Sequence, residues 1–188
     1  MKKLAVFFPG IGYTNDKPLL YYSRRLAASA GYEVRLLSYG GFPPDVFGDP
    51  DKMTACCRIA LSQAQAALAD VDWTSFDEIL FVGKSVGTSI AAWIAAKSPV
   101  RGRIRLVLFT PLEETFSFPT DNAIVFTGTD DPWTGGADSQ VPALCEKRGV
   151  PCVVVPGGNH SLETGDAEAD LLHLQTVIQE AKRFILEP

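Results

Sequence analysis

The amino-acid sequence predicts an α/β fold, a three-layer sandwich in which helices cover both faces of a mostly parallel, six-stranded sheet. Two observations predict it. Short runs rich in β-branched and aromatic residues alternate with longer segments of helical periodicity along the whole chain. The short runs are continuously apolar, as strands are when both of their faces are buried. Because 188 residues is an ordinary length for one domain, we expect residues 1–188 to form a single domain.

Six segments have the composition of buried strands, and five have the periodicity of helices. The predicted strands are Leu4–Phe8, Glu33–Leu37, Glu78–Val82, Arg105–Phe109, Asn122–Thr127 and Cys152–Val155. The predicted helices are Pro18–Ala30, Asp51–Ala69, Val86–Ser98, Ser139–Arg148 and Ala167–Leu186. Strands that alternate with helices in this way indicate a parallel sheet that is covered on both faces.

Local signals mark some of the element boundaries. Gly31 is placed to end the first helix, because glycine readily adopts the left-handed conformation that closes many helices. Asp166 is a suitable N-cap for the last helix. The stretches Gly40–Pro50 and Thr110–Thr120 have the composition of surface loops.

Composition and charge narrow the class of protein. A net charge of −5 gives no electrostatic basis for binding nucleic acid or an anionic membrane surface. The apolar run Leu4–Phe8 is too short for a signal peptide, and no stretch reaches the roughly 18 apolar residues that a membrane span needs. We therefore expect a soluble, cytoplasmic protein that binds neither nucleic acid nor membrane.

The cysteines do not suggest a metal site. Cys56, Cys57, Cys145 and Cys152 include no C-x-x-C pair, and adjacent cysteines are an improbable arrangement for zinc or a disulfide. We expect reduced thiols that pack as small hydrophobic residues, and no bound metal.

A glycine-bounded turn follows the third predicted strand. It reads Gly83-Lys84-Ser85-Val86-Gly87 and leads directly into a predicted helix. A sharp strand-to-helix turn of the G-x-S-x-G type lifts the central serine off the sheet, and glycines avoid collisions on either side. The helix N-terminus beneath favours developing negative charge. We predict that Ser85 is a nucleophile.

Two other glycine motifs do not fit this chain. A phosphate-binding loop needs a glycine five residues before Gly83, where the sequence has Glu78. The segment from Gly10 to Asn15 begins like a dinucleotide fingerprint, but Asn15 stands where the third glycine belongs. No cofactor is expected.

A serine nucleophile needs a base, and the chain has only two histidines. His173 lies inside the last predicted helix, whereas His160 lies in a loop directly after the last strand, where α/β proteins build their sites. The base needs a carboxylate to orient it, and Asp130 and Asp131 both follow the preceding strand. His160 is the predicted base, and either aspartate could serve it.

These residues resemble the α/β-hydrolase superfamily over almost the whole chain. Gly128-Thr129-Asp130-Asp131 matches the family's G-x-x-D turn after the penultimate strand, which implies Asp131 as the acid and Asp130 as the alternative. The short connection from Phe109 to Asn122 leaves no room for the helical cap of many relatives. The resemblance implies a minimal, six-stranded α/β-hydrolase fold without a cap domain, and a shallow, open pocket.

The resemblance also implies an oxyanion hole. In the family, a backbone amide after the first strand and the amide after the nucleophile donate to the oxyanion. Here they would be the amides of Ile11 and Val86, with Gly12 as a near alternative. Pro9 departs from the histidine that commonly precedes the glycine in this loop, but the required group is a backbone amide rather than that side chain.

Other residues lie near these positions in sequence. We interpret Lys84 as a solvated or salt-bridged residue that could hold a substrate carboxylate near the mouth of the site, rather than as part of a Ser–Lys dyad. Trp133, Tyr13 and Phe42 are candidates for the pocket or its rim, although each could equally pack in the core.

The predicted function is hydrolysis of a small carboxylic ester or thioester through an acyl-enzyme. Ser85, His160 and Asp131 would form the triad, and activity would rise as the pH passes the pKa of His160, about 6.5 when unperturbed. The small-molecule acyl substrate is the expected partner. The alternatives are a non-catalytic binding protein with this fold, and an acyltransferase that uses the same triad.

Overall fold

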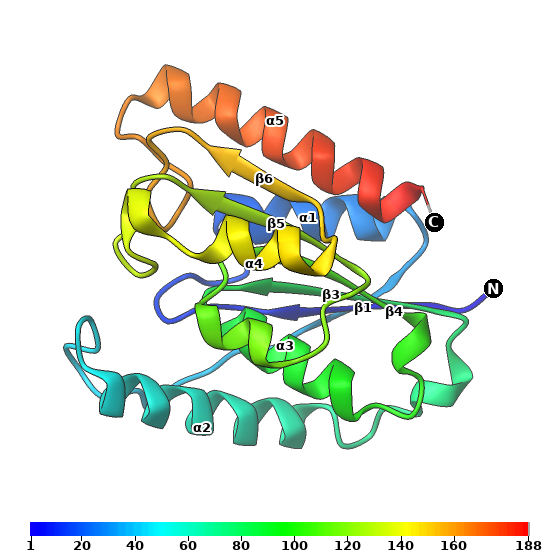
Figure 1. The fold of residues 1–188 in the computed structure, drawn as a ribbon. Helices are drawn as coiled ribbons and strands as arrows, with labels where there is room; N and C mark the ends of the chain where they lie inside the picture. The colour runs from blue at the N-terminus through cyan, green and yellow to red at the C-terminus, as the bar shows by residue number, and fades with distance from the viewer. Residues whose placement is uncertain (188) are drawn as a thin grey trace.

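The computed structural model describes residues 1–187, which form one parallel sheet of six strands between layers of helices (Figure 1). The strand order is β2-β1-β3-β4-β5-β6, and every neighbouring pair is parallel. The strands are β1 (Lys3–Phe8), β2 (Glu33–Leu36), β3 (Glu78–Lys84), β4 (Ile104–Phe109), β5 (Ala123–Gly128) and β6 (Cys152–Val155). The predicted fold class is confirmed, with a sheet that is wholly rather than mostly parallel.

Five helices cover the two faces of the sheet (Figure 1). They are α1 (Pro18–Ser29), α2 (Pro50–Ala67), α3 (Val86–Lys97), α4 (Val141–Arg148) and α5 (Ala167–Leu186). Helices α1 and α5 pack on one face, where their apolar residues share a core layer with Leu80 and Val82 of β3. Helices α2, α3 and α4 pack on the other face with Ile79 and Phe81. Alternation along β3 therefore divides the core into two layers.

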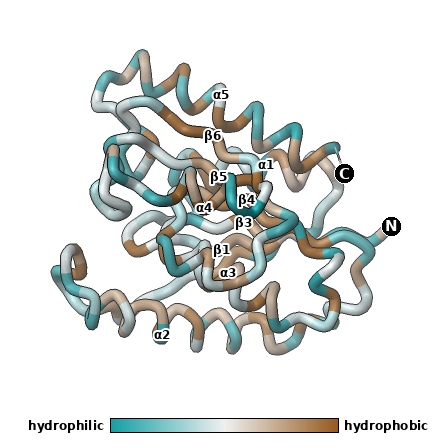
Figure 2. The backbone as a smooth tube through the Cα atoms, in the orientation of Figure 1, coloured by the Kyte–Doolittle hydropathy of each residue, from teal (hydrophilic) through white to brown (hydrophobic). Residues whose placement is uncertain are grey.

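The apolar residues gather in the middle of the molecule. Figure 2 shows hydrophobic colour along the central strands and mostly hydrophilic colour in the outer loops. Strands β1, β3, β4 and β5 are almost wholly buried, as expected of inner strands covered on both faces. The two edge strands differ from the prediction, since Leu36 of β2 and Val154 of β6 are exposed. Each edge strand has only one neighbour, so part of its surface meets solvent.

The helix boundaries follow local chemistry. The side chain of Asp166 accepts a hydrogen bond from the Ala169 amide at 2.9 Å, so it caps α5 as predicted. Gly31 follows α1 with a φ of +83°, the conformation in which glycine is favoured. Asp49 caps α2 by accepting hydrogen bonds from Asp51 and Lys52. Among residues 1–187, no helix combines the length and the apolarity that a membrane crossing requires.

The connection between β4 and β5 is not the surface loop that its composition suggested. Thr110, Leu112, Thr115, Phe116 and Thr120 are buried. Much of the connection forms a 3-10 turn at Glu113–Ser117, and that turn packs against α3. The sequence did not indicate this burial, because polar and small residues are typical of exposed loops. The parallel sheet places the ends of β1, β3, β4, β5 and β6 at one edge, where the predicted site residues meet.

Candidate active site

Ser85 occupies the turn between β3 and α3, and its backbone is strained. Its φ is +54° and its ψ is −126°, a conformation that non-glycine residues rarely adopt. The flanking glycines are needed because the turn is crowded. A Cβ added to Gly87 would lie 2.1 Å from the Phe8 carbonyl oxygen, and one added to Gly83 would lie 2.8 Å from the Thr88 Cα. The predicted sharp turn, with a serine at its apex, is present.

Buried hydroxyl groups support this turn from below. The Thr88 hydroxyl donates to the Ser85 carbonyl oxygen at 2.6 Å and lies 2.8 Å from the Thr115 hydroxyl. The Thr115 hydroxyl is also 2.9 Å from that of Ser89. This chain links the first turn of α3 to the β4–β5 connection, so it fixes the Ser85 backbone against a second element. Sequence reasoning missed Thr115, since nothing local distinguishes it from a loop threonine.

The loop between β6 and α5 brings His160 to Ser85. The His160 Nε2 lies 2.8 Å from the Ser85 Oγ, and the His160 Nδ1 lies 2.8 Å from the Asp131 Oδ2 and 2.9 Å from its Oδ1. Ser85 is 7 % exposed and the His160 side chain 19 % exposed. The structure thus joins in one hydrogen-bonded chain three residues that stand 29 to 75 positions apart in sequence.

The structure distinguishes the two adjacent aspartates after β5. Asp131 is fully buried and also accepts a hydrogen bond from the Trp133 amide at 3.0 Å. Asp130 is exposed, and its carboxylate accepts a hydrogen bond from the Thr129 hydroxyl at 3.0 Å. Asp131 therefore orients His160, and Asp130 belongs to the turn.

The turn with Asp131 and the loop with His160 are held together by main-chain contacts. The Asp130 amide donates to the Gly158 carbonyl oxygen at 3.0 Å, and the Gly157 amide donates to the Thr129 hydroxyl at 2.7 Å. A Cβ on Gly128 would lie 1.9 Å from the same Gly158 oxygen. The two segments approach so closely that only glycine fits at the end of β5.

Thr110 anchors the His160 loop from another strand. It is the first residue after β4, is fully buried, and donates from its hydroxyl to the His160 carbonyl oxygen at 3.1 Å. Its φ of +42° is unusual for a β-branched residue. Sequence reasoning missed Thr110, although a polar residue at the carboxyl end of a buried strand was the available signal.

The first loop of the chain lies against the Ser85 turn. A Cβ on Gly10 would lie 3.2 Å from both the Ser85 Cβ and the Lys84 carbonyl oxygen. Ile11 follows Gly10, and its amide donates no hydrogen bond within residues 1–187. Val86 is the first residue of α3, so its amide has no intrahelical partner. Gly12, the alternative donor, follows Ile11 in this loop and has a φ of +70°.

Aromatic side chains form a wall beside His160. The Trp133 ring centroid lies 5.5 Å from that of His160, and the Phe47 ring packs edge-on against Trp133 at 4.9 Å. Phe47 is 60 % exposed and comes from the Gly40–Pro50 loop, so it is a rim residue that sequence reasoning missed. Phe42 instead packs against Tyr39 and the core. Tyr13 is also a core residue, and its hydroxyl accepts from the Leu19 amide.

The prediction for Lys84 is wrong. It is neither solvated nor salt-bridged within residues 1–187, since it is only 1 % exposed and forms no ion pair. Its Nζ lies 4.9 Å from the centre of the Tyr13 ring. The alternation of β3 explains this position, because Lys84 has the same parity as Leu80 and Val82 and so points into the layer beneath α1 and α5.

The electrostatics of the site follow from burial. Burial lowers the pKa of His160 below its ordinary 6.5; the hydrogen bond to Asp131 opposes this effect, and the Lys84 charge adds to it. Burial also lowers the pKa of Lys84 to about 7, against the opposing influence of Asp131. Burial raises the pKa of Tyr13, which therefore stays a neutral phenol. The His160 imidazole therefore loses its proton at a lower pH than an unperturbed histidine does.

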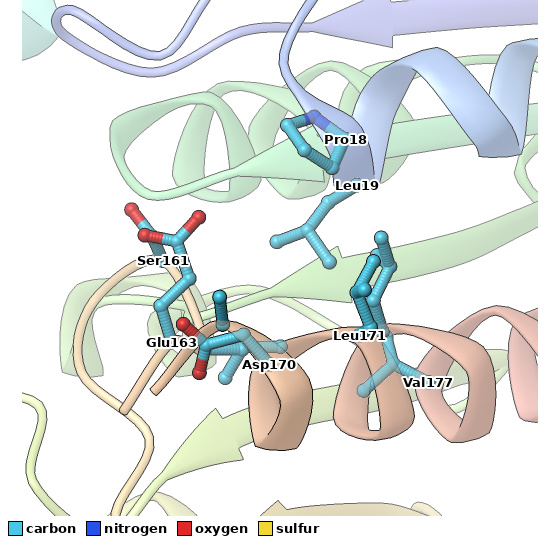
Figure 3. Close-up of a pocket in the computed structure, with 10 residues that line it drawn as sticks. Pro18, Leu19, Ser161, Glu163, Asp170, Leu171 and Val177 are labelled. Carbon is cyan, nitrogen blue, oxygen red and sulfur yellow. The ribbon is translucent and has the colours of Figure 1, made fainter. Parts of the chain in front are cut away.

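Two cavities of about 340 Å³ lie on opposite faces of the sheet. One lies between the N-terminal ends of α1 and α5, where Pro18 and Leu19 face Leu171 and Val177 (Figure 3). The other lies between α2 and α3 and includes Trp93. Neither lining contains Ser85, His160 or Asp131. The reactive groups therefore lie outside both cavities.

Comparison with solved structures indicates the fold class of this chain. No family model matches the sequence, and no curated protein matches it. Among solved structures, Est1E from Butyrivibrio proteoclasticus superposes with a TM-score of 0.64 at 12 % identity, covering 99 % of this chain and 88 % of that one. An alpha-beta serine hydrolase homologue from Coxiella burnetii gives 0.63 at 17 % identity, covering 95 % of this chain and 84 % of that one.

A third solved structure is described as having no lid. A serine hydrolase without lid from Xanthomonas campestris superposes with a TM-score of 0.61 at 16 % identity, covering 99 % of this chain and 83 % of that one. In this chain the residues from 110 to 122 hold a 3-10 turn between β4 and β5 and no longer helix. The chain therefore has the fold of the α/β-hydrolase superfamily, in a form without a cap domain.

Proposed function

We propose that this protein is a serine hydrolase that cleaves a small carboxylic ester or thioester through an acyl-enzyme. One observation carries the proposal: the Ser85 Oγ, on a strained turn at a helix N-terminus, lies 2.8 Å from the His160 Nε2, whose other nitrogen meets buried Asp131. A nucleophile, a base and an orienting carboxylate in contact are the arrangement that acyl transfer needs.

The reaction proceeds in two halves. The Ser85 Oγ forms a bond to the substrate carbonyl carbon while the His160 Nε2 takes the hydroxyl proton. Amides of Ile11 and Val86 donate to the oxyanion, and His160 then protonates the departing alcohol or thiol as its bond to carbon breaks. Water then attacks the acyl carbon while His160 takes its proton, and His160 returns that proton to the Ser85 Oγ as the bond to the acyl carbon breaks and the carboxylic acid leaves. Asp131 stabilises the imidazolium in both halves.

The short connection after β4 supports a small acyl group. The connection between β4 and β5 holds a 3-10 turn and no helical cap, and exposed Phe47 packs on Trp133 beside His160. A site without a cap and with one aromatic side suits a short acyl chain better than a long lipid chain, which needs an enclosed apolar tunnel.

A fluorophosphonate probe tests the proposal directly. We expect the wild-type protein to be labelled at Ser85 and the Ser85→Ala variant to remain unlabelled, with Ser29→Ala on exposed α1 as the matched control that labels like wild type. Turnover of p-nitrophenyl acetate should fall by about 10³-fold or more in His160→Ala. Equal labelling of Ser85→Ala would reject the nucleophile, and equal near-zero turnover in wild type and His160→Ala would favour a binding protein. Faster acyl release to an added alcohol than to water would favour an acyltransferase.

A further inference from the structure

Lys84 is an unusual residue that the proposed reaction does not use. It directly precedes Ser85, and among residues 1–187 it is the only buried lysine or arginine. Burying an ammonium group in an apolar layer is costly unless other groups compensate for its charge. The Tyr13 ring, 4.9 Å from Nζ, provides one compensation, since the face of an aromatic ring attracts a cation.

Asp131 provides the opposite charge. Within residues 1–187 it is the only buried aspartate or glutamate, so the one buried acid and the one buried lysine serve the same site. The charges act on each other, because Asp131 raises the pKa of Lys84 against the effect of burial. Among residues 1–187, the Asp131 carboxylate forms hydrogen bonds only with the His160 ring and the Trp133 amide. A neutral imidazole alone would leave this carboxylate uncompensated.

The other ionisable groups near Lys84 come from three loops. Tyr13 follows β1 and carries no charge, because burial raises the pKa of its phenol. Asp131 follows β5, and His160 follows β6. Glu163, exposed in the same loop as His160, acts on Tyr13 rather than on Lys84. Asp131 and His160 are therefore the two groups through which the Lys84 charge can act.

Counting charges shows what the lysine does for the reaction. Below pH 7, where Lys84 keeps its proton, the charges of Lys84 and Asp131 cancel in the resting site, and Ser85 and deprotonated His160 are neutral. When the serine attacks, an imidazolium and an oxyanion form together, so the sum again is zero. Without Lys84, the site would hold a net negative charge in both states, and that charge would hold a proton on His160 more tightly.

On the basis of the proposed function, we propose that Lys84 is a positioning residue for the triad. Its buried ammonium, held against the Tyr13 ring, balances the Asp131 carboxylate and keeps the His160 imidazole free to accept the Ser85 proton. Lys84 thus acts through His160 and does not touch the substrate.

The test measures the protonation of His160 without any substrate. The chain has only two histidines, so imidazole NMR gives two titration curves, and His173→Gln assigns them. We expect the His160 midpoint to lie below 6.5 in the wild type and to rise by about one pH unit, a tenfold tighter proton, in Lys84→Met. Lys84→Gln is a second neutral replacement and should raise the His160 midpoint as Lys84→Met does. The test therefore does not depend on the folding of a single variant. Lys97→Met, at the exposed end of α3, should match wild type.

The two proposals fail in different ways. A His160 midpoint that stays in place or falls in both neutral variants would overturn the role of Lys84, even if Ser85 is labelled by the probe. A raised midpoint with no labelling of Ser85 in wild type would leave the Lys84 role standing and reject the hydrolase. If both proposals are right, the rate of Ser85 labelling falls at acidic pH as His160 gains its proton. The pH at which this fall occurs should then rise in Lys84→Met together with the His160 midpoint. A purely structural lysine would change the labelling rate without moving that pH.

Discussion

Burial separates the roles of two neighbouring carboxyl groups. Asp131 is fully buried against His160, whereas Asp130 is exposed in the same turn. We expect Asp131→Asn to lower p-nitrophenyl acetate turnover by about 10³ to 10⁴, because an amide cannot stabilise the imidazolium and favours the wrong tautomer of His160. Asp130→Asn is the matched control and should retain at least half of the wild-type rate. A greater loss in Asp130→Asn than in Asp131→Asn would reverse the assignment.

The sequence predicted the contacts of individual residues where few residues of the required type were present. Two histidines, one of them after the last strand, made His160 the obvious base, and the structure brings it to Ser85. Lys84 was misjudged because a lysine at a turn is usually solvated. Its ammonium group packs against the ring of Tyr13, which lies in a loop more than seventy positions earlier in the sequence. A local sequence pattern cannot indicate a contact between residues so far apart.

The arrangement of Asp131 and His160 depends on the packing of two connecting segments against each other. The turn after β5 and the loop after β6 share the hydrogen bond from Asp130 to Gly158, and Gly128 leaves room for it. We expect Gly128→Ala to push these segments apart, to lower the free energy of unfolding by about 1 to 3 kcal/mol, and to slow Ser85 labelling at least tenfold. Urea denaturation and labelling kinetics would measure the two effects.

The matched control for that glycine is Gly102. A Cβ on Gly102 meets no atom within 4 Å, and the residue does not have a positive φ. Gly102→Ala should therefore leave both the stability and the labelling rate close to wild type. If Gly128→Ala behaved like Gly102→Ala, the close approach of the two segments would not matter for the site.

At the element scale, the sequence predicted every strand and every helix to within two residues at each end. Continuous apolar runs and helical periodicity carry that information, because they reflect which faces are buried. The same signals do not give the order of strands in a sheet. The exposure of Leu36 and Val154 on the edge strands, and the burial of the β4–β5 connection against α3, depend on that order.

Most of the buried residues form apolar core layers, whereas the buried charged residues Lys84 and Asp131 lie at the sheet edge that holds Ser85. Both core layers are apolar, but the layer beneath α1 and α5 ends in Lys84, so folding must remove one ammonium group from water. In the folded state the pKa of Lys84 is about 7, against 10.5 in its usual setting. Below pH 7 both states bind the proton, and the folded state bears the full burial cost. Between pH 7 and 10.5 the unfolded state binds more protons, so stability should rise with pH.

Urea denaturation at several pH values measures this effect on the whole chain. Between pH 7 and 8.5 we expect the Lys84 contribution to raise the free energy of unfolding of the wild type by about 1 to 2 kcal/mol. The interval stops at 8.5 because burial raises the pKa of Cys57 to about 11 and that of Tyr32 to about 12, and both oppose the rise at higher pH.

Lys84→Met should lack that rise, because it has no ammonium group whose proton is lost on folding. Lys97→Met should follow the wild-type curve, because its side chain is exposed. Parallel curves for wild type and Lys84→Met would mean that residue 84 keeps its proton in the folded protein well above pH 7. The Lys84→Met variant could unfold at higher urea than wild type and yet be labelled more slowly at Ser85 at acidic pH. That result would indicate that the buried ammonium group benefits the reaction and lowers the stability of the fold.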